Sequence, residues 1–152
     1  MEKTKKNLFE ASVLVLVLTA LSLVRNIIDV IKNAGKTYTN LPEGVTQEIM
    51  QIAMITLSAF AFVFVFLGAF VGFKGLMIAT GKSEYEGKAH IILANILLVL
   101  FVIALISTIS TVFKATGTDL ILNIAGIVSA ACSCLAYFLF AKSASDFRKA
   151  NK

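Results

Sequence analysis

Two short stretches of this sequence end like a phosphate-binding loop, and they are the first place to look for chemistry. GLMIATGKS occupies residues 75–83, and NAGKT occupies residues 33–37. The loop motif needs a glycine, four residues and then Gly-Lys-Ser/Thr, because consecutive backbone N–H groups wrap the phosphates. Five residues separate Gly75 from Gly81, and Val30 stands where the partner of Gly35 should be. Both spacings fail, so we expect no nucleotide to bind.

The other residue types that support catalysis are few and scattered. Cys132 and Cys134 are two positions apart, so on a helix they point to different sides and cannot pair. His90 is the single histidine, and no carboxylate or thiol is spaced to act with it. A metal site would need further ligands near the cysteines. The sequence therefore predicts no catalytic residue, no cofactor and no metal, and favours a protein that is not an enzyme.

Polar residues interrupt otherwise apolar segments, and polar groups at membrane depth are often functional. Arg25, Asp29 and Lys32 are spaced by four and three residues, which places them along one side of a helix. The favoured interpretation is a helix that outlasts the bilayer, with the arginine extending to the surface. The alternative is a polar path or vestibule. Its candidate residues are Arg25, Asn26, Asp29, Lys32, Asn95, Ser107 and Thr111.

Four apolar stretches must position these residues. They run from 11 to 24 with an extension to 31, from 52 to 73, from 91 to 113 and from 120 to 141. The last three contain 22, 23 and 22 residues without a formal charge, and about 20 residues cross a bilayer as a helix. The hydrophobic content of 58% and the mean hydropathy of +0.87 also exceed what a soluble domain needs. We predict an all-α integral membrane protein, a four-transmembrane-helix antiparallel bundle.

The expected organisation is one membrane domain over residues 1–152, with helices at about 8–33, 46–80, 86–114 and 119–148. The second helix, about 50 Å long at 1.5 Å per residue, should project from the bilayer. Gly35 and Gly81 each follow a predicted helix and fit left-handed caps. The stretch SEYE at 83–86 fits a capping box for the third helix.

The distribution of Lys and Arg predicts the orientation. With both termini inside, inner segments carry ten of these residues and outer segments carry three, and positive residues are retained on the cytoplasmic side. The net charge of +5 then reflects this bias. We expect the protein to lie in a bacterial-type plasma membrane, with the lipid bilayer as a partner and both termini in the cytoplasm. We expect no nucleic-acid partner, because the sequence has no basic patch with interleaved aromatic residues.

Small residues form stripes on two predicted helices, and small side chains let helices approach closely in membranes. Packing inside one chain and an oligomer seam explain the stripes equally well. The residues are Ala61, Gly68, Gly72, Gly75 and Ala79 on the second helix, and Gly126, Ser129 and Ser133 on the fourth.

These observations favour a non-enzymatic small polytopic membrane protein. It self-associates as a channel or pore, or it serves as the integral subunit of a transport or secretion complex, so its expected partners are further copies or other membrane-protein subunits. One alternative is a membrane-embedded enzyme with an inner-leaflet site near Lys74, Lys88 and His90. Another is a regulatory or immunity-type membrane binder.

Overall fold

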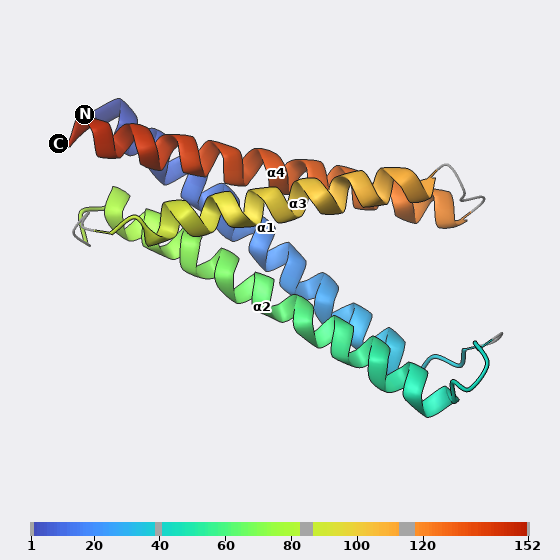
Figure 1. Ribbon diagram of the computed structural model, residues 1–152. Coiled ribbons are helices and arrows are strands. Elements are labelled where there is room, and N and C mark those ends of the chain that lie inside the picture. The colour runs from blue at the N-terminus through green and yellow to red at the C-terminus, as the bar shows by residue number, and fades with distance from the viewer. Residues whose placement is uncertain (1, 39–40, 83–86, 113–117, 152) are drawn as a thin grey trace.

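The described residues of the chain form four helices, which confirms the all-α prediction. The structure, a computed structural model, describes residues 2–38, 41–82, 87–112 and 118–151, and side chains outside 111–123. The helices are α1 (Glu2–Ala34), α2 (Gln47–Ala79), α3 (Ala89–Val112) and α4 (Thr118–Ala150) (Figure 1). Each contains a segment long and apolar enough to cross a membrane. The fold is therefore consistent with an integral membrane protein.

The first helix begins at Glu2, earlier than the predicted start near residue 8. The charged segment before the apolar stretch is itself helical, and Lys6 and Glu10 form an ion pair across one turn, 3.8 Å from Nζ to Oε1. Lysine and glutamate are good helix formers. The helix therefore extends through the charged segment and does not begin where the apolar stretch begins. The third helix begins at Ala89, after Gly87 rather than before it. The predicted capping box at 83–86 lies outside the described residues.

Both ends of α2 are closed by recognisable caps. Thr46 is the N-cap residue, and its Oγ1 accepts a hydrogen bond from the backbone N–H of Ile49 at 3.3 Å. At the other end Gly81 has a φ of 74°, as predicted for a left-handed cap. The N–H of Lys82 donates to the Met77 carbonyl at 2.8 Å, and the N–H of Gly81 donates to the Ile78 carbonyl at 3.1 Å. This pattern is a Schellman motif.

The prediction of a left-handed cap at Gly35 is wrong. The described glycines with positive φ are Gly44 and Gly81. Instead, side chains of α2 hold the segment that follows α1. The side-chain amides of Gln47 and Gln51 donate to the Lys36 carbonyl at 3.0 and 3.1 Å. Because these bonds come from the neighbouring helix, the end of α1 does not require a left-handed residue.

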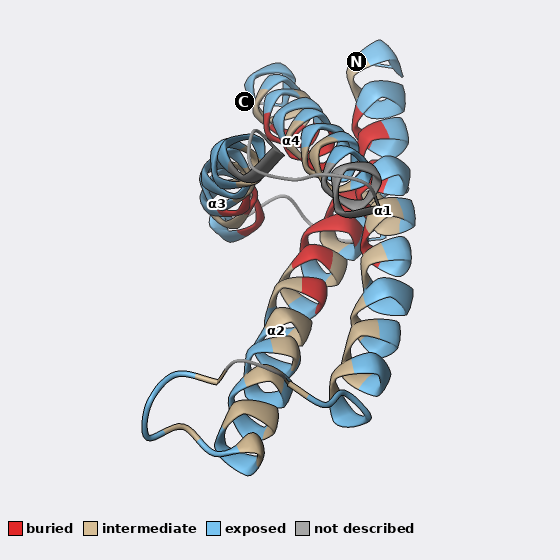
Figure 2. Ribbon diagram, turned by 90° about the vertical axis from the view of Figure 1, so that its right-hand side faces the viewer, coloured by how far each residue is buried: buried red, intermediate tan, exposed pale blue. Residues whose placement is uncertain are grey.

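The four helices form two antiparallel hairpins, α1 with α2 and α3 with α4 (Figure 1). We call the end where both termini lie the terminal end; α2 finishes and α3 starts there. The opposite end, where α1 and α3 finish, is the open end. The hairpins pack together toward the terminal end and diverge toward the open end, as two views at right angles agree (Figures 1 and 2).

Burial follows this arrangement closely. Among the described residues, every buried one lies within 8–19, 65–79, 90–97 or 133–144. Figure 2 shows these segments meeting where the hairpins cross. The largest fully buried side chains include Leu8, Leu97 and Phe140, one from each of three helices. The core thus joins the two hairpins over about half of their length, while the open halves expose apolar side chains.

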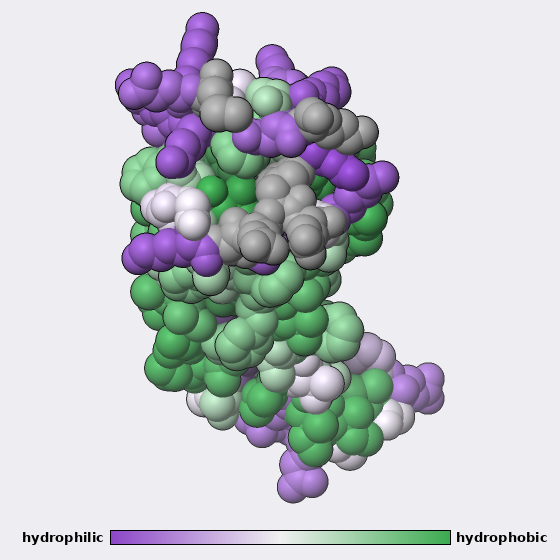
Figure 3. All heavy atoms as spheres, turned by 90° about the vertical axis from the view of Figure 1, so that its left-hand side faces the viewer, coloured by the Kyte–Doolittle hydropathy of each residue, from purple (hydrophilic) through white to green (hydrophobic). Residues whose placement is uncertain are grey.

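Hydrophilic side chains gather at the terminal end, hydrophobic side chains form a broad band below them, and a second hydrophilic group lies at the bottom of the view (Figure 3). This polarity is typical of helices whose ends reach the membrane interface. The charged residues at the terminal end include Lys3, Lys5, Lys82, Lys88, Arg148 and Lys149.

Candidate functional site

The small-residue stripe of α2 faces helices of its own chain. Gly68, Gly72, Gly75 and Ala79 are all buried. A Cβ atom built on Gly72 would lie 2.6 Å from Cγ of Leu16 on α1. One built on Gly75 would collide with Ser12 of α1 and Phe140 of α4. These glycines therefore let α1 and α4 close over α2, which favours packing inside one chain over an oligomer seam.

Gly68 lies at the point where both hairpins meet. A Cβ atom there would lie 2.5 Å from the Tyr137 hydroxyl oxygen on α4 and 2.8 Å from Oγ1 of Thr19 on α1. The ring of Tyr137 also stacks on Phe101 of α3. Tyr137 thus contacts all three other helices, and sequence reasoning missed it. The only sequence signal for Tyr137 was indirect. The glycines of α2 predict that a bulky side chain packs against them, but they do not indicate which helix supplies it.

The other small residues do not form one buried face. Ala61 is half-buried, and so is Gly126, whose added Cβ would lie 3.4 Å from Cγ2 of Thr108 on α3. Ser133 is buried, and its hydroxyl donates a hydrogen bond to the backbone carbonyl of the exposed Ser129 at 3.0 Å. The fourth helix therefore uses its small residues partly against α3 and partly in the central core.

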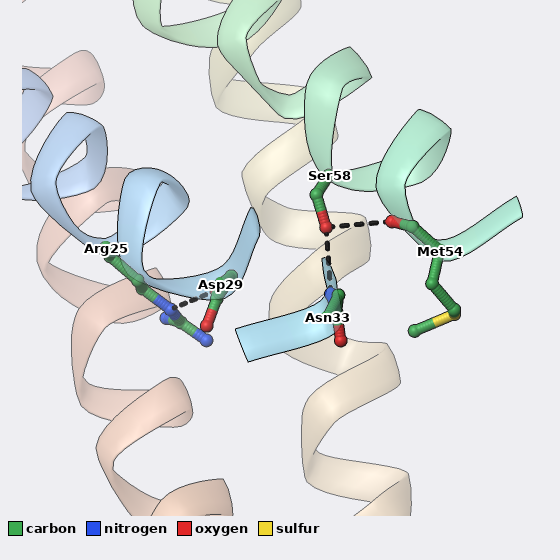
Figure 4. A network of polar contacts seen from close by, with 5 residues as sticks. All are labelled: Arg25, Asp29, Asn33, Met54 and Ser58. Atoms are coloured by element: carbon green, nitrogen blue, oxygen red, sulfur yellow. Dashed lines mark hydrogen bonds and ion pairs between the residues drawn. The ribbon is translucent and has the colours of Figure 1, made fainter. Parts of the chain in front are cut away.

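Polar contacts join the two helices of the first hairpin at the open end (Figure 4). Nδ2 of Asn33 donates to Oγ of Ser58 at 3.0 Å, and that hydroxyl donates to the Met54 carbonyl at 2.9 Å. Nε of Arg25 lies 3.7 Å from Oδ2 of Asp29, with both side chains well exposed. Arg25 and Asp29 lie along α1, whereas Asn33 points to α2. Asn33 and Ser58 were not among the predicted site residues.

The predicted vestibule residues do not come together in one chain. Asn26 is half-buried, Lys32 is exposed and both belong to α1, whereas Asn95 and Ser107 are exposed on α3. Among the described residues, the most extensive contacts join α1 with α2, α3 with α4, α1 with α4 and α2 with α3, so α1 and α3 are not among the closely packed pairs. The side chain of Thr111 lies outside the description. A polar path through these residues would need more than one chain.

Asn95 stands out because it is a strongly polar side chain on an exposed apolar face. A shallow depression of about 430 Å³ surrounds it, lined by Ile92, Ile96, Val99 and Leu100. Within the described part of the chain, its carboxamide makes one hydrogen bond, from Nδ2 to the Ile91 carbonyl at 2.9 Å. Among the described residues, its Oδ1 and second N–H therefore have no hydrogen-bond partner, and the residue is exposed. We call this surface the Asn95 face.

Of the residues suggested for an inner-leaflet enzyme, the histidine offers little access to a substrate. His90 has 1% of its surface exposed, and its ring lies edge-on to Phe140 with centroids 6.2 Å apart. Lys88 is exposed and Lys74 is half-buried. A general acid or base must reach the substrate proton, and the burial of His90 opposes that.

Within the described residues, no three His, Cys, Asp or Glu side chains gather closely enough to hold a metal ion. Cys132 and Cys134 are free thiols, one exposed and one half-buried.

The fold and its surface define a class: an all-α protein whose four helices are each able to cross a membrane. Comparisons with protein-family models, curated proteins and solved structures gave no match.

Proposed function

We propose that this protein is a non-enzymatic membrane protein that associates with further copies of itself. It acts as a channel or as the integral subunit of a transport or secretion complex. The observation that carries the proposal is the Asn95 face, where a carboxamide with unused donor and acceptor capacity projects from an apolar helix. Lipid tails offer such a group no hydrogen bond, whereas a second polar helix does.

A second copy of the same face is a suitable partner because a carboxamide is both a donor and an acceptor. Two Asn95 side chains related by a twofold axis can each donate to the other, as in an isologous interface. Interhelical hydrogen bonds in membranes contribute about 0.6–2 kcal/mol each. The apolar residues beside Asn95 then supply the packing around the pair.

The proposal includes an antiparallel four-helix bundle in a bacterial-type plasma membrane, with the terminal end in the cytoplasm. The lysines and arginines at that end support this orientation. Association of copies would also be needed to bring the polar residues of α1 near those of α3, because one chain keeps them apart.

Native mass spectrometry of the purified particle tests the proposal. The wild-type protein should contain two or more copies, and Asn95→Leu should shift the distribution toward single chains. Asn95→Gln is the matched control, since it retains a carboxamide at the same position and should remain associated. A wild-type particle with a single copy would refute self-association, and an Asn95→Leu variant with unchanged mass would remove the Asn95 face from it.

A further inference from the structure

A groove lies between α1 and α4 at the terminal end, apart from the Asn95 face. It is open to the surface and has a volume of about 320 Å³, within the usual size range of small-molecule sites. Five polar residues line it: Asn7 and Glu10 from α1, and Lys142, Ser143 and Asp146 from α4. Neither the core packing nor the proposed self-association uses these side chains.

The groove is polar at one end and apolar at the other. Glu10 and Leu14 are one turn apart on α1, and Lys142 and Leu139 are one turn apart on α4. Because the two helices are antiparallel, the two leucines lie together on the side away from the termini. The apolar stretches of the chain also begin at residue 11 and end at residue 141. The groove therefore crosses the boundary between the polar end and the apolar body.

Its charges are mixed and available. Within the described residues, the ion pairs are Lys6 with Glu10 and Arg25 with Asp29. Lys142 and Asp146 both line the groove, one turn apart, without forming an ion pair. The Lys6–Glu10 contact is long, at 3.8 Å, and strongly exposed, so a ligand can compete with it. The groove thus presents two carboxylates and an ammonium group to the same space.

We propose that this groove binds a membrane lipid with a zwitterionic primary-amine headgroup, of the phosphatidylethanolamine type. The lipid ammonium donates hydrogen bonds to the carboxylates of Glu10 and Asp146, and the lipid phosphate accepts from Lys142 and the Ser143 hydroxyl. The acyl chains lie against Leu14 and Leu139. This inference does not rest on the proposed function or on the orientation in the membrane.

The chemistry also indicates which lipids should bind less well. A trimethylammonium headgroup has no N–H to donate, so a choline lipid loses the directional bonds to both carboxylates. A glycerol headgroup with a net negative charge meets two carboxylates without supplying a cation. The free phosphoethanolamine headgroup has the right charges but lacks the chains that cover the leucines.

The test uses the full chain, stripped of lipid in detergent, and native mass spectrometry with equal amounts of ethanolamine, choline and glycerol phospholipids that share the same acyl chains. We expect at least threefold more of the ethanolamine adduct than of either other lipid. Free phosphoethanolamine in excess should not displace it. Equal adducts of all three lipids would overturn the proposal, and displacement by that excess of the free headgroup would overturn the lipid as its ligand.

Two variants locate the site. Glu10→Gln combined with Asp146→Asn should abolish the preference for ethanolamine over choline, while Lys142→Gln should weaken binding of both. Asp29→Asn removes a comparable α1 carboxylate near the open end and should leave the preference intact. Circular dichroism confirms that each variant retains its helices. Persistence of the ethanolamine preference in the folded double variant would place the lipid elsewhere and overturn the assignment.

Discussion

The ring of Tyr137 on α4 stacks on the ring of Phe101 on α3, with centroids 5.5 Å apart and planes 16° from parallel. The hydroxyl of the same tyrosine interacts with Thr19 of α1 and lies directly over Gly68 of α2. One side chain thereby links the α3–α4 hairpin to the α1–α2 hairpin. Since the hairpins diverge beyond this level, its fit against Gly68 is important for holding them together.

Gly68→Ala should destabilise the protein. Alanine is favoured over glycine in a helix by about 1 kcal/mol, but the new methyl group would lie 2.5 Å from the Tyr137 hydroxyl oxygen. Overpacking a well-filled core costs about 1–3 kcal/mol, and Tyr137 is buried and stacked, so it has little room to move. We expect a net loss of about 1 kcal/mol in the free energy of unfolding, measured by denaturant titration in mixed micelles.

Two further variants make the Gly68 test specific. Gly126→Ala is the matched control on α4, because its methyl group would meet its nearest neighbour at 3.4 Å; it should be neutral or slightly stabilising. Tyr137→Phe removes the hydroxyl that collides with the added methyl group, so it should recover part of the loss when combined with Gly68→Ala. Additive losses in the double variant would contradict the contact.

Gly81→Ala and Gly35→Ala should differ, although both glycines follow a helix. Gly81 has a φ of 74°, and an L-residue pays about 1–2 kcal/mol in that conformation. Gly35 has no positive φ and open space around its Cα, so alanine there should be neutral or stabilise by up to about 1 kcal/mol. The same unfolding titration compares the two. Equal losses would mean that the two helix ends share one cap geometry after all.

These two glycines illustrate what the sequence could predict about the fold. Long apolar stretches predicted four helices because hydrophobic content is a local property of the sequence. The glycine after α2 predicted the cap of that helix because this cap also depends on residues close together in the sequence. The end of α1 depends on Gln47 and Gln51 reaching across from α2, a tertiary contact that no local pattern indicates. The start of α1 was misplaced because the charged residues before Leu8 form helix as readily as apolar ones.

The candidate sites show the same limit. Spacing correctly placed Gly68, Gly72 and Gly75 on one side of a helix, but only the packing of α1 and α4 shows that their own chain fills that side. Polarity at membrane depth also grouped Asn95 with Arg25 as vestibule residues, whereas they belong to different hairpins. The groove between α1 and α4 combines residues far apart in the sequence, from Asn7–Leu14 on α1 and from Leu139–Asp146 on α4. Neither helix alone carries a pattern that predicts it.

Asp29→Asn tests the channel form of the proposed function. The Arg25–Asp29 pair is 3.7 Å long, with side chains 63% and 46% exposed, and exposed pairs contribute about 0–1 kcal/mol. The substitution should therefore change the free energy of unfolding by less than about 1 kcal/mol.

If associated copies line a path with the Asp29 carboxylate, losing its charge should lower the preference for cations over anions, because Arg25 is then unopposed. Ion flux into liposomes, with Asp146→Asn as a control carboxylate at the terminal end, measures that preference. Absence of flux with the wild-type protein would exclude the channel and leave the subunit role.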